Sequence, residues 1–506
     1  MTRPTIPGRF SGAHMASLDS DTHTAPSAEA HGGDPLYETV ARRLLAQIDV
    51  GALRPGDRVP SVRELSRKTG YSITTALKAY EHLEALGAIE SRPRSGYFVR
   101  LEPARAQALP QTLEIPPGPA SLISADVISS VLETVSRPGL VPLAHASPAP
   151  ELLPVAQLHH LTRRLLREDP DTAAGYLMPP GHAGLRQQIA RRLAGHRCEV
   201  SPDDIVITTG SLEAINLCLR LLCCAGDTIL MESPTYSGLL QVAEEMRLRV
   251  VELPNHPQHG IDPDDLRRAI RRHRVAAALF VQNFNNPTGS LLPEEAKRDI
   301  VQTLNGHGVP LIEDDIYGEL GYACGRATPL KAYDEADMVL HCSSLSKTLS
   351  PGLRVGWVAS HRWRRELIRH KFTLSTATNS LSQMIAGAFL ESSAYDRHLR
   401  TLRATLARSV ARFSEAVLRH FPPQTAVSRP QGGFVLWIEL PRNVDGLELF
   451  QRAARERISV NPGVIFSANG SYQNYLRINC ALPWSAEIEQ AIATLGRIAS
   501  WQARRA

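Results

Sequence analysis

The chain has 506 residues, of which 43% are hydrophobic and 21% charged, and its net charge is +5. This length is too great for one compact core and predicts two or more domains. No apolar run approaches the roughly 20 residues of a membrane helix, which argues against a membrane protein. The seven cysteines form no C-x-x-C pair, so we expect no metal site.

Two segments of unusual composition divide the chain. Residues 1–34 are rich in Ser, Ala, Thr, Gly and His and lack a continuous apolar stretch, so we expect a disordered extension and a cytoplasmic protein. Residues 101–122 carry five prolines, which predicts a semi-rigid linker. The linker separates a head (residues 35–100) from a body (residues 123–506). The head has eleven Lys and Arg against seven Asp and Glu, so we expect it to bind a polyanion.

The head is predicted to contain three helices. The first has a buried stripe at four-residue spacing, formed by Leu36, Val40, Leu44 and Ile48. A second should begin after Ser61, because Ser61 and Glu64 have the spacing of a capping box. Gly70 permits a sharp turn, and Ser72 can cap a third helix that buries Ala76, Tyr80 and Leu83.

Helix, turn and helix at this spacing are typical of a DNA-reading pair. The stretch GAIESRPRSGYFV that follows predicts a two-stranded wing with arginines near its tip. The candidate DNA contacts are Ser72, Ile73, Thr74, Thr75 and Lys78 on the third helix, with Arg92 and Arg94 on the wing.

Residues 36–99 resemble the winged helix-turn-helix of the GntR regulators, through G-x-L-x-P-G-D-R-V-P-S-V-R-x-L-S and S-G-Y-F-V. The resemblance implies that Arg63 touches the DNA backbone. Many relatives carry arginine where this chain has Ile73, so the operator sequence does not follow.

The body alternates apolar runs with helical patterns, which predicts an α/β fold with a mostly parallel sheet. The expected buried strands are DIVITTG, DTILMES, VAAALFVQN, VPLIEDD, MVLHCSSLS and LRVGWVAS. From about residue 425 the pattern changes to GGFVLWIELP, VNPGVIFS and NYLRINCAL, which predicts a smaller C-terminal α+β subdomain over residues 425–506.

Several strand ends carry residues that suit pyridoxal 5′-phosphate (PLP), which needs a lysine, an acid for its ring nitrogen, a phosphate cup and a ring platform. Lys347 in SSLSKTLSPGLRVGW is the candidate lysine, although a surface lysine is the better interpretation of this stretch alone. Asp314 is the candidate acid; Glu313 and Asp315 compete for that role, but strand alternation puts them on the opposite side. The other candidates are Tyr317 and Asn286 for the phenolic oxygen, Tyr236 for the ring, and Ser211, Leu212, Ser344, Ser346 and Arg354 for the phosphate.

Together these stretches resemble the fold type I aminotransferases over roughly residues 140–500. The resemblance implies that Lys347 forms a Schiff base with PLP and that Tyr176, in GYLMPPGHAGLR, reaches the phosphate of a neighbouring subunit in a homodimer. It also implies that Arg477, in NYLRINCA, binds a substrate carboxylate. One departure is Leu212, where many relatives have glutamine, so only its backbone amide can contact phosphate.

A GntR head joined to an aminotransferase-like body resembles the MocR subgroup of bacterial transcription regulators. The resemblance implies a DNA-binding regulator that senses PLP or an amino compound through Schiff-base chemistry. An active aminotransferase with an accessory head is the alternative, because catalysis uses the same Lys347, Asp314 and Arg477. A structural DNA-binding protein with an inactive body predicts the loss of cofactor groups, and none is lost.

Overall fold

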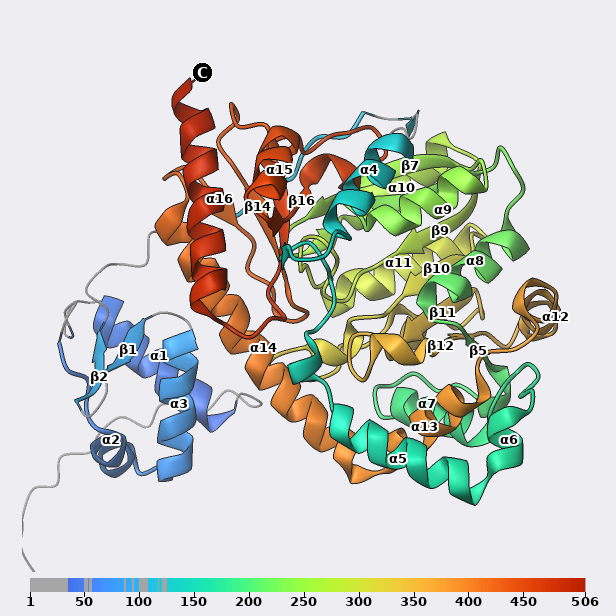
Figure 1. Ribbon diagram of the computed structural model, residues 1–506, viewed down its shortest axis with the longest axis horizontal. Coiled ribbons are helices and arrows are strands. Elements are labelled where there is room, and N and C mark those ends of the chain that lie inside the picture. Colours follow the sequence, from blue (N-terminus) through green and yellow to red (C-terminus); the bar gives the residue numbers. More distant parts are fainter. Residues whose placement is uncertain are drawn as a thin grey trace, which may run out of the picture. The chain divides into compact units, whose positions relative to one another are not determined.

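The computed structural model describes residues 35–49, 53, 57–85, 88–92, 95–99, 108–116, 118–120 and 125–505. The chain forms two compact units, Met1–Glu102 and Pro103–Ala506 (Figure 1). The predicted extension, residues 1–34, lies outside the described residues. Within them, no helix combines the length and the apolar character needed to cross a membrane.

The head contains the three predicted helices and the predicted wing. These elements are α1 (Leu36–Asp49), α2 (Val62–Thr69), α3 (Ile73–Ala85), β1 (Ile89–Arg92) and β2 (Gly96–Val99). Val40, Leu44 and Tyr80 are buried in its core, whereas Leu36, the first residue of α1, is 56% exposed and does not join the predicted buried stripe. The amide of Val59 donates to the carbonyl of Tyr97, so residues 57–59 add a third line of backbone pairing to the wing.

The caps of α2 and α3 are those that the sequence predicts. Ser61 Oγ accepts the amide of Glu64 at 3.2 Å, and Ser72 Oγ accepts the amide of Thr75 at 3.1 Å. Gly70 ends α2 at φ +74°, a left-handed conformation that glycine adopts without the steric cost of a side chain.

The body is built on one large, mostly parallel sheet in the order β3-β7-β6-β9-β10-β11-β12-β5, with β8 paired to β7. Its longer strands are β5 (Ile205–Thr208), β6 (Thr228–Ser233), β7 (Arg249–His256), β9 (Val275–Phe280), β10 (Leu311–Asp314), β11 (Val339–Ser344) and β12 (Gly356–Ala359). The short strands β3 (Pro119–Ala120) and β8 (Gly260–Ile261) lie at the β7 edge. Strand β12 pairs antiparallel with both β11 and β5, whereas β7, β6, β9, β10 and β11 are mutually parallel.

Helices cover both faces of this sheet. Alternate residues of one strand enter different cores: Ile229 and Met231 of β6 join one hydrophobic cluster and Leu230 joins another. The helices of the large domain are α5 (Val155–Glu168), α6 (Pro170–Ala174), α7 (Ala183–Ala194), α8 (Ser211–Leu222), α9 (Ser237–Glu245), α10 (Pro263–Arg272), α11 (Glu294–Gly306), α12 (Arg364–Ser375) and α13 (Ser380–Glu391). Burial on both faces explains why the sequence shows these strands as continuous apolar runs.

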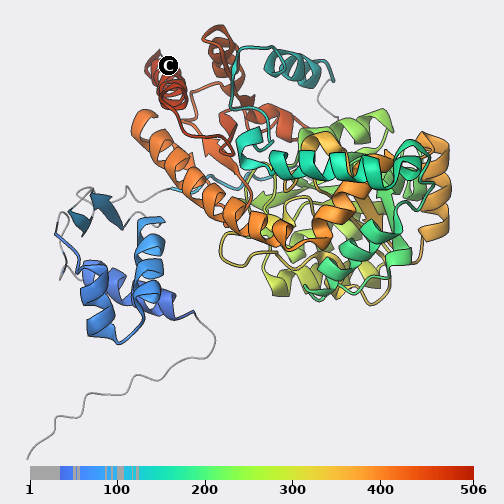
Figure 2. The same cartoon turned by 60° about the horizontal axis from the view of Figure 1, so that its bottom comes forward.

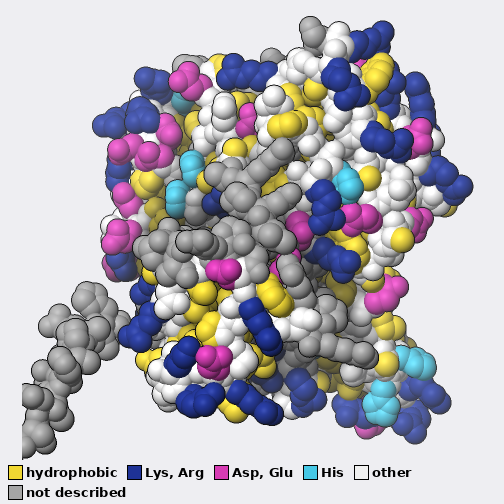
Figure 3. Space-filling view, turned by 90° about the vertical axis from the view of Figure 1, so that its left-hand side faces the viewer, with side chains coloured by type: hydrophobic (Ala, Val, Ile, Leu, Met, Phe, Trp, Pro, Cys, Tyr) yellow, Lys and Arg dark blue, Asp and Glu magenta, His cyan; other side chains and the backbone are white. Residues whose placement is uncertain are grey.

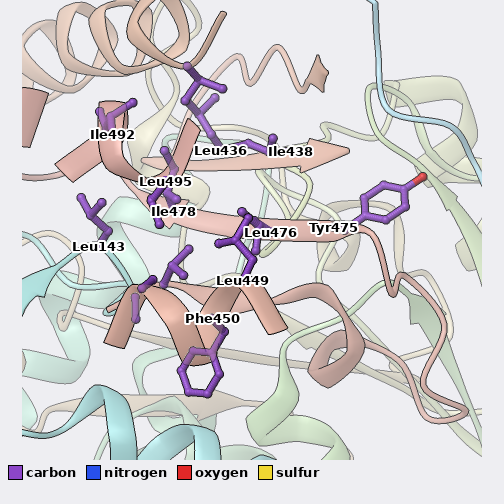
Figure 4. Close-up of a cluster of buried hydrophobic side chains, with 14 of the residues drawn as sticks. Leu143, Leu436, Ile438, Leu449, Phe450, Tyr475, Leu476, Ile478, Ile492 and Leu495 are labelled. Carbon is purple, nitrogen blue, oxygen red and sulfur yellow. The ribbon is translucent and has the colours of Figure 1, made fainter. Parts of the chain in front are cut away.

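The small subdomain is larger than the predicted residues 425–506. Its core contains β14 (Val435–Glu439), β17 (Tyr475–Asn479), α15 (Gly446–Arg455) and α16 (Ala486–Arg505), but also α4 (Ala125–Val135). Shorter strands complete it: β4 (Val141–Pro142), β13 (Ala426–Val427), β15 (Ile458–Ser459) and β16 (Asn461–Pro462). Figure 4 shows side chains of β14 and β17 packed with Leu449 of α15 and with Leu495 of α16.

Helix α14 (Ser393–His420) connects the two parts of the body. Leu402 and Leu406 in its first half pack with Tyr317 of the large domain, whereas Phe413 and Val417 in its second half join the core of the small subdomain. Figure 2 shows this long helix (orange) running along the body. The small subdomain is therefore attached to the large domain by a continuous helix.

Part of the predicted linker is packed on the body. The amide of Gln111 donates to Glu439 Oε2 at 2.7 Å, and the amide of Val427 donates to the carbonyl of Ala108 at 3.1 Å. Residues 119–120 then form β3 at the edge of the large sheet. The described part of residues 101–122 is thus anchored to both the small subdomain and the large sheet.

We predict that Leu449→Ala lowers the free energy of unfolding of the body by about 2–5 kcal/mol, because it leaves a cavity in a closed core. Leu449 is fully buried in the small subdomain. The matched control is Leu132→Ala on α4, where the side chain is 40% exposed and the expected loss is about 0.5 kcal/mol or less. Urea unfolding followed by tryptophan fluorescence measures both, and equal losses would contradict the packing described.

Candidate functional site

Lys347 lies just beyond the end of β11, where the sheet presents its carboxyl edge. Its Nζ donates to the carbonyl oxygen of Ala146 at 2.6 Å. Burial lowers the pKa of Lys347 to about 8, helped by the charges of Arg477 and Arg354 and opposed by Asp314. A larger fraction of this side chain is therefore a free amine near neutral pH than for an ordinary lysine, which favours Schiff-base formation.

Asp314 ends β10 and is buried beside Lys347. Burial, followed by the negative charge of Asp315, raises the pKa of Asp314 to about 7. Its Oδ1 is buried and has no hydrogen-bond partner among the described residues. The neighbouring Glu313 instead accepts the amide of Leu330 on the other side of the strand. Side chains therefore alternate along β10 as the sequence predicts: Glu313 points away from the site and Asp314 faces it.

A network of buried polar groups around the next residue, Asp315, fixes the end of β10. Asp315 accepts hydrogen bonds from Asn283 at 2.8 Å and from Arg326, and it contacts His341 at 3.2 Å. The hydroxyl of Ser343 donates to the backbone carbonyl of Asp315 at 2.9 Å. Because these contacts hold the adjacent residue, they also fix the position of Asp314.

Tyr317 and Asn286 lie together on the same side of the site. The buried Tyr317 hydroxyl is hydrogen-bonded to the Asn286 side chain, and burial is the main cause that raises the pKa of Tyr317. Asn286 Oδ1 is buried and has no hydrogen-bond partner among the described residues. Glu232 supports this loop, because it accepts hydrogen bonds from the amide of Val281 at 2.9 Å and from Asn285 at 3.2 Å.

The start of α8 and the side chain of Arg354 form a polar cradle. Ser211 and Leu212 occupy the first turn of α8, where backbone amides have no partner within the helix and attract anions. The preceding Gly210 has φ +84°, and a Cβ there would lie 2.6 Å from Arg354 Nη2. Arg354 also donates to the carbonyl of Thr209 at 3.1 Å. A side chain at residue 210 would therefore displace the guanidinium from the cradle.

The predicted serines and tyrosines fall into two groups. Ser344 and Ser346 are buried near the end of β11, and Ser344 Oγ accepts the amide of Ser346 at 3.3 Å. Tyr236 is 39% exposed, and its ring lies against Gly238, where a Cβ would come within 2.6 Å of the ring. Asp314 and Arg477 both act on the pKa of Tyr236, which burial raises, so this ring belongs to the same site. Tyr176 is 79% exposed, and no contact among the described residues brings it to the site.

Arg477 lies in the middle of β17, opposite Trp437 of β14. Its guanidinium is buried, packs over the ring of Phe466 and donates through Nη2 to the carbonyl of Ala144 at 2.7 Å. Its Nε and Nη1 are buried and have no partner among the described residues. Burial lowers the pKa of Arg477 to about 10. These unpaired donors suit a carboxylate.

The residues present fit PLP. The buried Asp314 Oδ1 lacks a partner among the described residues and can accept a hydrogen bond from a protonated ring nitrogen, whereas the phenolic oxygen needs donors such as the Tyr317 hydroxyl and Asn286 Nδ2. The guanidinium of Arg354 lies directly against Gly210, so a cation and the first amides of α8 meet where the phosphate would bind. The unpaired Nε and Nη1 of Arg477 are donors available to an anionic group of a ligand.

The head presents its predicted DNA contacts to solvent. Ile73 is 56% exposed, and Arg63, Ser72, Thr74 and Lys78 are also exposed. Thr75 is half-buried, and its hydroxyl lies 2.8 Å from that of Ser72, so both hydroxyls also serve the cap of α3. The side chain of Arg92 and all of Arg94 lie outside the described residues. Lys and Arg side chains (dark blue) are spread across the face of the protein seen in Figure 3.

Sequence reasoning missed three supports of the site. The carbonyl of Ala144 accepts a hydrogen bond from Arg477, and that of Ala146 accepts one from Lys347. Such contacts cannot be predicted from residue types, because every residue has a backbone carbonyl. Glu232 could have been found, because an acid at the end of the buried strand TILMES is unusual unless it is paired. The groups around Asp315 come from separate elements, and only the fold brings them together.

Two family models match the chain. "Aminotransferase class I and II" matches residues 149–495, and "Bacterial regulatory proteins, gntR family" matches residues 36–99. The chain is 36% identical to the uncharacterized HTH-type transcriptional regulator YjiR of Escherichia coli, covering 91% of this chain and 98% of that protein. It is 32% identical to a 2-aminoadipate transaminase of Thermus thermophilus, covering 75% of this chain and 94% of the relative.

The body also resembles solved aminotransferases. The crystal structure of LysN, an α-aminoadipate aminotransferase from Thermus thermophilus complexed with N-(5′-phosphopyridoxyl)-L-leucine, aligns with a TM-score of 0.70 and 30% identity. The alignment covers 76% of this chain and 97% of that structure. The mostly parallel sheet is therefore that of the fold type I aminotransferases, and the cofactor of this domain is PLP.

We predict that the rate at which the cofactor-free protein takes up PLP rises about tenfold per pH unit below pH 8 and levels off above it. The reason is that the free amine of Lys347 reacts, and its pKa is lowered to about 8. Stopped-flow absorbance after mixing with PLP measures the rate, and Lys347→Ala, which should form no visible band, is the control. A rate that keeps rising to about pH 10.4, the ordinary value for lysine, would contradict this account.

Proposed function

The chain belongs to the MocR subgroup of GntR-type regulators, in which a DNA-binding head is joined to an aminotransferase class I and II domain, and we propose that it is a transcription regulator whose body senses an amino compound at its PLP site. One observation carries the proposal: a GntR head is joined to a body in which Lys347, Asp314 and Arg477 converge on one site. The proposal includes a cytoplasmic location, where such a regulator meets DNA.

The described residues supply each contact that PLP needs. Lys347 would bind its aldehyde carbon, Asp314 its ring nitrogen, and Tyr317 with Asn286 its phenolic oxygen. Tyr236 would support the ring. The phosphate would be held by Ser211, Leu212, Ser344, Ser346 and Arg354. When bound, PLP offers a carbonyl that condenses with amines and a ring that withdraws electrons from the carbon next to the nitrogen.

Arg477 and Lys347 determine which ligands the site accepts. The second N–H of Arg477 Nη2, together with the unpaired Nη1 or Nε beside it, can donate two parallel hydrogen bonds to a carboxylate. Lys347 supplies a basic amine that can hold or release a proton at Nζ, because its pKa is lowered to about 8. A ligand with an amine next to a carboxylate satisfies both residues, so the site favours α-amino acids.

The regulatory part of the proposal requires that ligand binding change the affinity for DNA. A ligand shifts a conformational equilibrium only by the difference between its affinities for the two states. Arg477 belongs to the small subdomain and Lys347 to the large domain, so a ligand that contacts both residues favours one arrangement of these parts. Residues 108–116 and 118–120, which are packed on the body, belong to the segment that follows the head in the sequence.

We further propose that the protein acts as a homodimer with shared PLP sites. Tyr176 is a predicted site residue that no contact among the described residues of its own chain brings to Lys347. Its 79% exposure and the 46% exposure of nearby Met178 are typical of side chains that a second subunit covers. In this arrangement Tyr176 of one chain reaches the phosphate in the other.

An active aminotransferase is the second candidate function. The specific observation in its favour is the lowered pKa of Lys347, since a lysine that stays partly unprotonated can also serve as the general base of a transamination. Sensing and turnover use the same residues, so product formation has to be measured to separate the two candidates.

We predict that Arg63→Ala and Lys78→Ala weaken binding to duplex DNA and each reduce the salt slope by about one, because each removes one phosphate contact. Both side chains are exposed on the head. Fluorescence anisotropy at several salt concentrations measures the effect, and the exposed Arg271→Ala on α10 is the control. The visible spectrum of bound PLP should be unchanged; parallel loss of this spectrum would mean that the head is not an independent unit.

We predict that Arg477→Ala weakens the response of the PLP spectrum to L-alanine by about 100-fold, since a buried charged hydrogen-bond pair is lost. Arg477→Lys keeps the charge without the two-pronged geometry and should give an intermediate value. Absorbance titration measures both variants. An unchanged titration in Arg477→Ala would remove Arg477 from the ligand site.

A further inference from the structure

A buried lysine that does not belong to the predicted PLP contacts lies next to the start of α8. Lys371 of α12 is fully buried. Its Nζ donates to Glu213 Oε2 at 2.8 Å and to Ser375 Oγ at 2.7 Å. The hydroxyl of Ser375 donates to Glu213 Oε1 at 2.7 Å, so both oxygens of this carboxylate are engaged.

Glu213 connects this lysine to the residues that precede α8. It lies in the first turn of α8, and its Oε2 also accepts the amide of Thr209 at 2.6 Å. The carbonyl of the same Thr209 accepts Arg354 Nη2 at 3.1 Å. A carboxylate therefore holds the amide of Thr209 and a guanidinium holds its carbonyl. Thr209 begins the phosphate loop (residues 209–211), which leads into the α8 amides proposed to bind phosphate.

The carboxylate of Glu213 needs a cation because it lies so close to an anion site. Burial alone would raise the pKa of Glu213, but its hydrogen bonds lower the pKa, the one from Lys371 most strongly. The side chain is therefore ionised at neutral pH. Two negative groups near each other repel, and more strongly in a partly buried site than in water. Glu213 can thus hold the phosphate loop without weakening phosphate binding only if its charge is compensated.

Building on the phosphate site proposed above, we propose that Lys371 is a positioning residue for the phosphate of PLP: it neutralises Glu213 and so allows this carboxylate to hold the phosphate loop without repelling the phosphate. The described hydrogen bonds of Lys371 reach neither Lys347 nor Asp314, so its effect should be confined to the phosphate end of PLP.

The test compares PLP with pyridoxal, which has the same ring and aldehyde but no phosphate. Quenching of tryptophan fluorescence in the cofactor-free, full-length chain measures both dissociation constants without any turnover. Lys371→Met leaves a half-buried carboxylate uncompensated, so it should weaken PLP binding about tenfold and pyridoxal binding about twofold or less. Lys371→Arg keeps the cation and should recover part of the preference for PLP.

The matched control is Lys297→Met on α11, which removes another fully buried lysine. Lys297 donates to Glu294 at 3.1 Å and to the carbonyl of Thr328 at 2.8 Å, and neither residue belongs to the phosphate loop. This variant removes a buried charge as Lys371→Met does, so it reports the general cost to the fold. It should leave the preference for PLP over pyridoxal unchanged.

Two further variants test the pairing itself. Combining Lys371→Met with Glu213→Gln removes both charges and should restore most of the preference for PLP, because no uncompensated carboxylate remains. Ser375→Ala removes two hydrogen bonds at an exposed residue and should lower the preference about threefold. Ser375→Ala decides the question if Lys371→Met does not fold.

The outcomes separate this inference from the proposed function. If the wild-type chain binds PLP no more tightly than pyridoxal, the proposed phosphate site fails and the role of Lys371 fails with it. If the wild-type chain prefers PLP but Lys371→Met weakens both ligands equally, or Ser375→Ala keeps the full preference, only the role of Lys371 is overturned. An equal loss of preference in Lys297→Met also overturns it, because any buried lysine would then have the same effect.

Discussion

Lys347 and Arg477 are two buried cations that lie beside a single carboxylate, and backbone carbonyls hold both of them in place by accepting hydrogen bonds. Ala144 and Ala146 accept one hydrogen bond each from Arg477 and Lys347. Because these carbonyls stabilise the cations without neutralising them, burial still lowers the pKa of Lys347 to about 8, and Arg477 keeps unpaired donors. Both properties that the site needs follow from this arrangement: a reactive amine and a free guanidinium.

The same contacts join the two parts of the body. The segment of residues 143–149 is bonded to the small subdomain through Asn479 and Asn461, yet Ala146 is held by a lysine of the large domain. A ligand that engages Lys347 competes with the hydrogen bond from its Nζ to the carbonyl of Ala146. Binding chemistry at the site is therefore coupled to how the small subdomain packs, with α14 as the continuous connection between the parts. This is a physical basis on which an aminotransferase fold can act as a sensor.

The sequence predicted most of the large sheet and most of the site because both leave side-chain patterns. Six strands were visible as apolar runs, but β7 was not, since Glu252, Pro254 and Asn255 interrupt it at the sheet's edge. The limits of the small subdomain were missed because α14 has one helical periodicity, although its two halves pack in different cores. The carbonyls of Ala144 and Ala146 could not be predicted, because any residue has a carbonyl and only the fold brings these two to the site.

The central claim is that an amino compound bound in the body changes the affinity of the chain for DNA without being steadily consumed. The most direct measurement is the dissociation constant of the PLP-loaded protein for a duplex selected in vitro from a random pool, with and without saturating amino acid, with keto acid measured in the same samples. The account predicts a change of about fivefold or more in DNA affinity, the size of an ordinary allosteric coupling, and no sustained keto acid formation. Unchanged DNA affinity together with continuous turnover would contradict it and would identify the chain as an enzyme.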